Sequence, residues 1–219
     1  MDVYYSPQAH SCAQRVISNM NSYLRTRYLF DFILSLFIIV VVSPVILLVV
    51  ALQAILYGTS NVFFVQQRIG ISNKPFDLLK IKTMSDELNK PECERQTAFG
   101  KILRRWGLDE LPQLINIIKG DMALIGPRPL LPEYLPFYST EQMKRHLIKP
   151  GIIGLAQANG RNAASWEERL KLDVDYVNSA SLRLDFWILV KTMKTLFAQR
   201  GNTEMLPRFD DYIRGQASQ

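Results

Sequence analysis

Cysteine and histidine are scarce in this 219-residue chain, which contains two of each. Cys12 and Cys93 lie far apart and belong to no paired motif, which excludes a disulfide scaffold and a cysteine-based zinc site. The shortage of thiols fits a reducing compartment. Because His10 and His146 are the only histidines, a metal-dependent hydrolase is disfavoured.

Motifs for nucleic-acid recognition are also missing. The chain has 26 Lys and Arg against 20 Asp and Glu, a modest net charge of +6. No zinc finger, recognition helix or aromatic sheet motif accompanies this surplus, so we expect no nucleic-acid partner. With 21% charged and 48% hydrophobic residues, the chain is not intrinsically disordered. Its length predicts a single globular domain.

Charge is absent from Phe32–Tyr57, a run of 26 residues in which the distinctly polar ones are Ser35, Ser43 and Gln53. As a helix, 26 residues would be roughly 39 Å long, enough to cross a hydrocarbon core of about 30 Å. A signal peptide is not expected, because no small-residue cleavage site follows the run. A buried core helix of this kind would need a larger protein around it. We therefore expect a membrane segment attached to a charged domain.

Ser43-Pro44 divides this run almost evenly. Proline lacks a backbone N–H and clashes with the carbonyl four residues earlier, so it kinks or breaks a helix. The serine hydroxyl could bond the freed carbonyl where water is absent. Two arrangements follow: a kinked helix that spans the membrane, or a re-entrant hairpin of two half-helices that returns to the same face. Basic residues flank the run on both sides, which favours two cytoplasmic ends, but the residues alone leave both arrangements open.

The chain from Gly58 onward holds 23 of the 26 basic and 18 of the 20 acidic residues. Its patterns predict a β-hairpin, then several helices separated by loops. The expected strands are Asn61–Gln67 and Pro75–Lys82, and the expected helices are Thr97–Trp106, Asp109–Lys119, Thr140–Arg145, Ser165–Asn178 and Leu182–Gln199. Ser165 and Glu168 form a capping-box pattern. The segment Gly120–Pro132 is expected to be an irregular loop. The apolar face of the last helix suits either core packing or the membrane interface.

Asp109-Glu110 is the candidate catalytic centre. The two carboxylates precede Leu111-Pro112, and acidic residues at the start of a helix are also good caps. The surrounding cations favour chemistry instead. Arginine in a proline-locked loop, such as Arg128, loses little freedom on binding an anion, and its planar fork suits phosphate oxygens. Carboxylates and cations together are typical of phosphoryl transfer, in which an aspartate can attack phosphorus and one or two carboxylates can hold Mg²⁺.

Taken together, these motifs resemble the bacterial sugar transferase family, the monotopic phosphoglycosyl transferases. The match runs in order over about residues 27–200. The resembling segments are Phe30–Leu34 leading into Ser43-Pro44, Lys80–Met84, Gly107–Leu114, Lys119–Pro129, Lys149–Ile152 and Ala156-Gln157 through Asn162. Leu155 departs from the aromatic residue that is usual in the family, which leaves the carboxylate pair untouched.

The resemblance implies a two-step exchange. Asp109 would attack the sugar-linked phosphate of a UDP-sugar and release UMP, and the phosphosugar would then pass to polyprenyl phosphate. Glu110 would assist as metal partner or proton acceptor, and the two carboxylates would hold Mg²⁺. By motif position, the residues that would contact phosphates are Lys82, Arg104, Arg128 and Arg161. Asp185 is a further matched residue, expected to support the site without a specified role.

The resemblance also implies a fold and a location. The fold is α+β and mainly helical, with a re-entrant helix broken at Ser43-Pro44 and a cytosolic catalytic domain that carries a small β-hairpin. The expected organisation is a lead-in over 1–26, the membrane segment over 27–57, the catalytic domain over 58–200 and a tail over 201–219. The protein would lie on the cytoplasmic face of the bacterial inner membrane, in contact with membrane lipid. A UDP-linked N-acetylated hexosamine is the expected donor type, while the exact sugar, the glycan pathway and the oligomeric state stay open.

Overall fold

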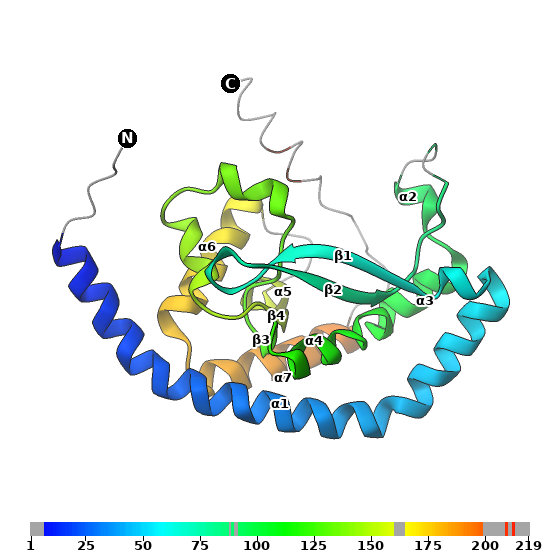
Figure 1. Ribbon diagram of the computed structural model, residues 1–219, viewed down its shortest axis with the longest axis horizontal. Coiled ribbons are helices and arrows are strands. Elements are labelled where there is room, and N and C mark those ends of the chain that lie inside the picture. Colours follow the sequence, from blue (N-terminus) through cyan, green and yellow to red (C-terminus); the bar gives the residue numbers. More distant parts are fainter. Residues whose placement is uncertain are drawn as a thin grey trace.

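The computed structural model describes residues 7–87, 89, 92–159, 165–198, 209 and 212. The protein is mostly helical, with a small antiparallel hairpin and one long apolar helix near the N-terminus, which confirms the mixed, mainly helical fold (Figure 1). The domain that follows the long helix lies on the concave side of that helix.

The long helix α1 (Pro7–Tyr57) continues through Pro44, whereas the family resemblance implied a re-entrant helix broken at Ser43-Pro44 and the residues alone also allowed a kinked helix. Pro44 has no N–H for the Val40 carbonyl, but Ser43 Oγ donates a hydrogen bond of 2.8 Å to that same oxygen. Because the freed acceptor is satisfied locally, the helix is not forced to break. It curves instead: the two ends of α1 rise on the side of the domain, and its middle runs along the base of the domain (Figure 1).

The apolar part of α1 is mostly not covered by the protein. Ser22–Tyr57 is long and apolar enough to cross a membrane, and 11% of its most apolar window is buried. A core helix of a soluble protein would be mostly buried, so this helix presents apolar surface outward. One side does pack on the domain: Ile38, Ile39 and Val42 contact a buried cluster that contains Leu114.

The predicted hairpin is present. Strand β1 (Phe63–Ile69) pairs antiparallel with β2 (Pro75–Ile81), from Phe63 opposite Ile81 to Ile69 opposite Pro75. The connection places Ser72 and Asn73 at positive φ angles of 54° and 60°, where short polar residues are tolerated better than bulky ones. The hairpin runs from the C-terminal end of α1 towards the helix α6 (Figure 1).

Short helices and turns complete the described part of the domain. The helices are α2 (Glu92–Arg95), α3 (Ala98–Trp106), α4 (Gln113–Lys119), α5 (Leu155–Ala158), α6 (Trp166–Ser179) and α7 (Leu182–Ala198). The 3₁₀ turns are η1 (Thr59–Asn61), η2 (Ile71–Asn73), η3 (Leu108–Glu110), η4 (Pro132–Phe137) and η5 (Gln142–Leu147). The capping box of Ser165 and Glu168 is confirmed at the start of α6. The helix predicted at Thr140–Arg145 is instead the 3₁₀ turn η5.

A parallel pair of short strands was not predicted. Strand β3 (Ala123–Ile125) pairs with β4 (Gly151–Ile153), within segments whose glycines and prolines predicted loops. A Cβ on Gly151 would lie 2.1 Å from the Gly126 backbone nitrogen, so the two strands meet at a close backbone approach that a side chain would block. The glycines that signalled a loop are what allow this pairing.

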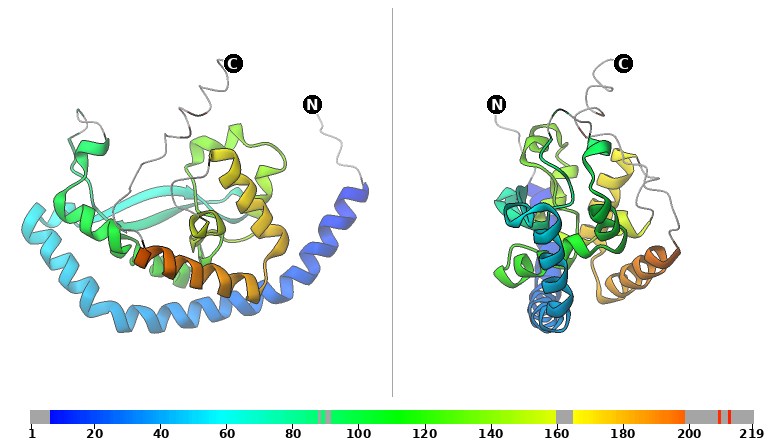
Figure 2. Two further views of the ribbon diagram at one scale, coloured as in Figure 1. Left: turned by 180° about the vertical axis from the view of Figure 1, so that it is seen from behind. Right: turned by 90° about the vertical axis from the view of Figure 1, so that its right-hand side faces the viewer.

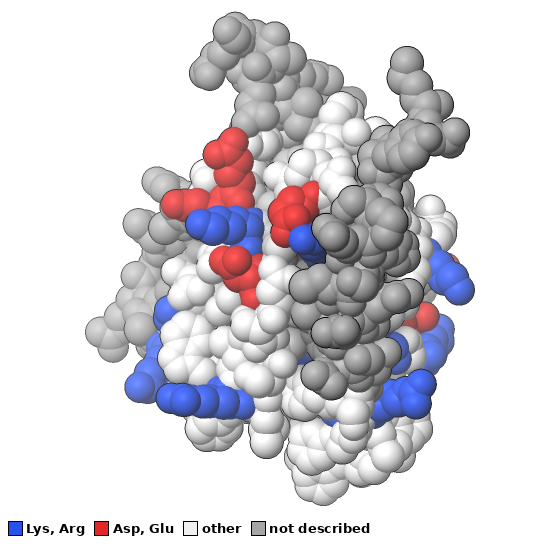
Figure 3. All heavy atoms as spheres, turned by 90° about the vertical axis from the view of Figure 1, so that its left-hand side faces the viewer, with Lys and Arg blue, Asp and Glu red and all other residues white. Residues whose placement is uncertain are grey.

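Helix α7 lies beside α1 and also exposes apolar side chains (Figure 2). Ile188 is fully buried, whereas Phe186 is 67% exposed. The other exposed apolar residues of α7 are Leu182, Trp187, Leu189, Val190 and Met193. On the face drawn in Figure 3, Lys and Arg gather on both flanks just above the uncharged lower part, and most Asp and Glu lie higher. This order of apolar, basic and acidic surface matches a protein seated on an anionic lipid surface.

Candidate active site

A cleft of about 810 Å³ brings together nearly all the predicted phosphate-site residues. Its walls come from the hairpin, the end of α3, the turn η3 and the loop after β3. The candidate residues that line it are Lys82, Arg104, Asp109, Glu110 and Arg128. Arg161 lies outside the described residues, so its predicted contact with phosphate stays a prediction.

The turn η3 sets the direction of the two carboxylates. Gly107 ends α3 in the left-handed conformation, with φ 69°, and its N–H bonds back to carbonyls of the last helical turn. The sequence predicted a helix that starts at Asp109, but α4 starts at Gln113, so the carboxylates lie on a separate 3₁₀ turn. They are therefore not helix caps, and this removes the structural explanation that competed with a catalytic one.

Glu110 is held tightly by two cations. Its Oε1 accepts from Arg128 Nη2 at 2.5 Å and from Lys80 Nζ at 3.1 Å. Burial alone would raise the pKa of the Glu110 carboxyl, but the charges of Arg128 and Lys80 outweigh burial and bring that pKa well below its usual range. Glu110 is thus ionised at neutral pH and fixed in position.

Asp109 has a different environment from its neighbour. Its residue is 6% exposed, yet its carboxylate makes no hydrogen bond or ion pair with any residue that the structure describes. Burial and then the charge of Glu110 raise the pKa of Asp109, while Lys80, Arg104 and Arg128 offset part of this rise. An unblocked carboxylate among cations has the properties of a nucleophile, and two adjacent carboxylates in contrasting environments divide their roles.

The other predicted cations also lie at the cleft. Arg104 Nε donates to Thr83 Oγ1 at 2.8 Å, which holds the guanidinium at the wall beside Asp109. Lys82 Nζ pairs with the exposed Asp86 at 2.6 Å. Lys80, the direct partner of Glu110, was not among the candidates. Residues two apart on a strand share a face. Because Lys82 was predicted on a strand and at the site, Lys80 could have been predicted to lie on the same face.

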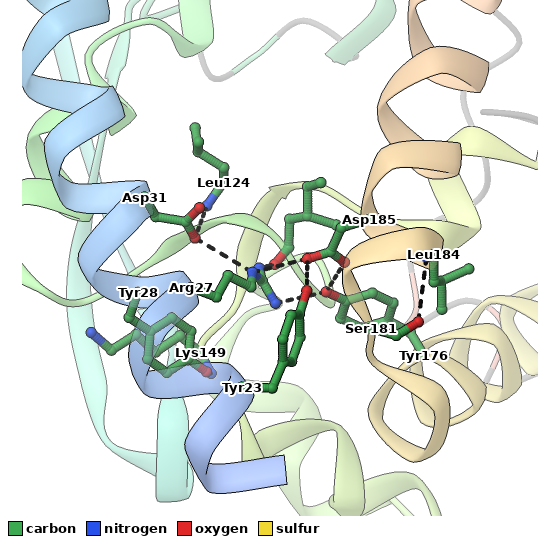
Figure 4. Close-up of polar contacts among 11 residues, drawn as sticks. Tyr23, Arg27, Tyr28, Asp31, Leu124, Lys149, Tyr176, Ser181, Leu184 and Asp185 are labelled. Atoms are coloured by element: carbon green, nitrogen blue, oxygen red, sulfur yellow. Dashed lines mark hydrogen bonds and ion pairs between the residues drawn. The ribbon is translucent and has the colours of Figure 1, made fainter.

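Asp185 lies outside the cleft, in a buried polar network (Figure 4). Arg27 of α1 pairs with Asp185 of α7 at 3.0 Å and with Asp31 at 3.6 Å. Tyr176 accepts from Arg27 at 2.8 Å and donates to Asp185 at 2.6 Å. Tyr23 donates to the other Asp185 oxygen at 2.7 Å. Asp185 therefore supports the structure by joining α1, α6 and α7.

The same network reaches the strand that leads to Arg128. The Leu124 N–H donates to Asp31 Oδ2 at 3.1 Å, and Arg27 donates to the Ile125 carbonyl. Leu124 and Ile125 belong to β3, and the chain reaches Arg128 three residues after this strand ends. Through the contact of Asp31 with Leu124 (Figure 4), helix α1 thus holds the base of the loop whose arginine contacts Glu110.

The donor set at the cleft fits Mg²⁺ with ligands that a substrate would add. Lys80 and Arg128 both contact Oε1 of Glu110, and Oε2 makes no hydrogen bond or ion pair with any residue that the structure describes. The Asp109 carboxylate is similarly unengaged by any described residue. No group of three or more Asp, Glu, His or Cys residues that could hold a metal ion occurs in the part of the chain that the structure describes. Magnesium commonly takes one or two carboxylates plus substrate phosphates, so these two residues are sufficient protein ligands.

Comparison with known proteins shows the family to which the chain belongs. The family model described as bacterial sugar transferase matches residues 22–199, which includes the cleft and most of α1. The chain belongs to the bacterial sugar transferase family. It is therefore an enzyme, a membrane-associated transferase.

Several curated members of the family are similar over most of this chain. The uncharacterized sugar transferase EpsL of Bacillus subtilis is 46% identical over 178 residues, which cover 79% of this chain and 88% of the relative. The exopolysaccharide production protein ExoY of Rhizobium meliloti is 34% identical and covers 79% and 86%. A UDP-glucose:undecaprenyl-phosphate glucose-1-phosphate transferase of Caulobacter vibrioides is 34% identical and covers 79% and 70%.

Proposed function

We propose that this enzyme moves a sugar-1-phosphate from a UDP-sugar to polyprenyl phosphate through a covalent phosphosugar on Asp109, releasing UMP and starting a glycan. The observation that carries the proposal is the unblocked Asp109 carboxylate in a cleft lined by Lys80, Lys82, Arg104 and Arg128. The names of related transferases, which specify undecaprenyl phosphate and UDP-sugars, support the substrate classes.

In the first step, a carboxylate oxygen of Asp109 attacks the phosphorus that bears the sugar. A new O–P bond forms, the bond from that phosphorus to the bridging oxygen breaks, and UMP leaves with the electron pair. In the second step, an oxygen of polyprenyl phosphate attacks the same phosphorus, and Asp109 leaves as a free carboxylate. The product is polyprenyl-diphospho-sugar, and no oxidant or further reactant is needed.

The cations stabilise the charge that moves during both steps. Arg104 and Arg128 face Asp109 from different walls, so phosphate oxygens bound between them lie within reach of the nucleophile. Glu110 pairs with Arg128 and Lys80 and keeps those two cations in place. Asp109 and Glu110 would also hold Mg²⁺, which supplies charge neutralisation for the phosphates when bound. We expect a chelator to abolish turnover and added Mg²⁺ to restore it.

This proposal includes a one-sided membrane attachment, in which both ends of α1 lie on the cytoplasmic side of the membrane. The arc of α1 brings both its ends back to the side of the domain, and basic residues flank its apolar middle (Figure 1). Labelling of Cys12 and Cys93 with an impermeant thiol reagent in oriented vesicles tests it. We expect both thiols to react from the cytoplasmic side, and reaction from opposite sides would contradict the one-sided attachment.

The decisive experiment measures UMP release from a panel of UDP-sugars in the presence of polyprenyl phosphate and Mg²⁺. N-acetylated hexosamine donors are expected to be used. Asp109→Asn should abolish release, whereas Asp175→Asn, an exposed change on α6, should leave it intact. Intact-mass measurement of the wild-type protein with donor alone should show the addition of one phosphosugar. Undiminished turnover by Asp109→Asn would disprove the assignment of the nucleophile.

A further inference from the structure

Three arginines from distant parts of the chain line one end of the cleft. Arg68 comes from β1, Arg128 from the loop after β3, and Arg169 from α6. The proposed chemistry uses Arg128 and assigns nothing to Arg68 or Arg169. A cluster of three guanidinium groups in one cleft calls for an explanation, since like charges repel strongly where water is partly excluded.

The electrostatics of the cluster reflect this repulsion. Burial and then the charge of Arg128 lower the pKa of Arg68 to about 10. The same two causes lower the pKa of Arg169, and Asp173 offsets part of that effect. Asp173 is itself engaged by Arg145 at 2.7 Å, and Glu110 pairs with Arg128.

Arg68 also has an unused hydrogen-bond donor. Its Nη2 donates to Gln66 Oε1 at 2.5 Å, but its buried Nε has no hydrogen-bond partner among the described residues. A buried donor without a partner is rare in folded proteins and suggests a group that binds there. Phosphate oxygens match both the charge and the donor geometry of arginine.

The position of the cluster distinguishes between the two substrates. The exposed apolar residues Phe63, Phe64 and Val65 line the other part of the cleft, at the end of β1 that follows α1. Arg68 lies five residues beyond Phe63 along the strand, a distance of about 17 Å at the usual rise. The hairpin leads away from the end of α1 towards α6 (Figure 1). These apolar side chains suit the entry of a lipid-borne phosphate at the Phe63 end, and the arginine cluster lies towards the other end of the hairpin, beside α6.

We propose that Arg68 and Arg169, together with Arg128, form a subsite for the phosphate of a water-soluble nucleoside monophosphate, the group that leaves from the donor. The assignment rests on the proposed function, because it takes the leaving group to be UMP. The cleft is then divided: the arginine cluster holds the nucleotide, Asp109 and Glu110 lie at the reacting phosphorus, and the lipid phosphate enters from the side of Phe63 to Val65.

The test is an equilibrium titration of UMP alone into the full-length protein in lipid nanodiscs, measured by calorimetry. Arg68→Gln and Arg169→Gln should each weaken UMP binding by about tenfold or more, because each removes a charged hydrogen-bond donor. The matched controls are Lys74→Gln, in the turn of the hairpin, and Lys171→Gln, on the exposed side of α6; both side chains are exposed and neither lines the cleft. Both controls should bind UMP as the wild type does. Unchanged UMP affinity in both arginine variants would overturn the proposal.

A second arm separates the two sources of phosphate. The affinity of a short-chain polyprenyl phosphate, titrated in the same nanodiscs, should not change in the arginine variants. Loss of lipid-phosphate binding with UMP binding retained would assign the cluster to the acceptor and overturn the proposal. Arg68→Lys keeps the charge and should recover part of the affinity. If Arg68→Gln does not fold, Arg169→Gln and Arg68→Lys carry the same test.

These measurements are independent of turnover. If no UDP-sugar supports UMP release but UMP binding depends on Arg68 and Arg169, the proposed function fails and the subsite stands. If turnover and the Asp109 adduct are observed but the arginine variants bind UMP normally, the proposed function stands and the subsite is wrong.

Discussion

Two adjacent residues with the same charge have opposite roles in this site because their partners differ. Glu110 is neutralised by Arg128 and Lys80, which lowers its pKa, while Asp109 is buried beside that carboxylate without a partner among the described residues, which raises its pKa. The first arrangement gives a fixed anion that organises cations, and the second gives an oxygen available to attack phosphorus. The distinction depends on which cation each side chain reaches.

The raised pKa of Asp109 predicts a pH dependence. Adduct formation needs the ionised carboxylate, so its rate should fall as the pH drops through a value above the ordinary 3.8 of aspartate. Glu110→Gln removes a neighbouring negative charge and leaves Arg128 and Lys80 acting on Asp109, which should lower its pKa. The acid limb of the single-turnover rate, scaled to its own plateau, should therefore move to lower pH in this variant.

The control for this pH profile is Glu141→Gln, an exposed change that removes the same charge outside the cleft and should leave the acid limb where it is. An acid limb that stays fixed or moves to higher pH in Glu110→Gln would show that Asp109 is not the titrating group.

At the scale of elements, short irregular segments position the chemistry. The turn η3 carries both carboxylates, and the loop after β3 carries Arg128. Strand β3 has three residues and depends on β4 for its place, with Gly126 and Gly151 in close backbone approach. Such an element has little stability of its own, so its position is set by what it packs against.

Gly151→Ala should therefore reduce activity as well as stability. The added Cβ would meet Gly126 nitrogen at 2.1 Å and force the strands apart, displacing the loop that holds Arg128. Such overpacking costs about 1–3 kcal/mol. We expect a fall in kcat per folded molecule, measured by UMP release with the folded fraction determined separately.

Gly58→Ala is the comparison for this change. Gly58 has φ 88°, and nothing lies within 4 Å of the point that a Cβ would occupy, so its substitution strains the backbone without a clash. It should lower stability and leave kcat unchanged. Equal kcat in Gly151→Ala and the wild type would show that the β3–β4 contact does not position Arg128.

At the scale of the whole molecule, one buried network joins the membrane helix to the catalytic domain. Arg27 of α1 contacts Asp185 of α7, Tyr176 of α6 and the carbonyl of Ile125 in β3. The side chains of Arg27 and Asp185 are 6% and 9% exposed, so each depends on the other for its charge to be compensated. The contacts of Arg27 therefore link the position of the membrane helix to the geometry of the cleft.

Removing Arg27 should therefore destabilise the protein strongly. Arg27→Ala leaves Asp185 and Asp31 buried without their cation, and breaking a buried pair in this way costs about 3–5 kcal/mol. Arg25→Ala is a matched control, since Arg25 lies two residues away on α1 with its side chain exposed, and it should change stability by no more than about 0.5 kcal/mol. Unfolding followed in the same detergent checks both, and equal stability of the two variants would contradict an anchoring role.

Several features of this protein could be predicted from local patterns. The uncharged run predicts an apolar helix, alternation and turn residues predict the hairpin, and Ser165 with Glu168 predicts the start of α6. The ordered motifs indicate the family, and five of the candidate residues that they contain lie in one cleft. These signals are local because propensity, periodicity and capping act within a few residues of the chain.

Contacts between distant segments were decided only by the tertiary structure. Lys80 contacts Glu110, 30 positions away in the sequence, and Arg27 contacts Tyr176, 149 positions away. The convergence of Arg68, Arg128 and Arg169, and the pairing of β3 with β4, are of the same kind. The sequence by itself determined which residues carry charge, apolar surface and turns. The fold decided which charges meet, because burial and proximity, and hence pKa values and partners, exist only once distant segments are packed together.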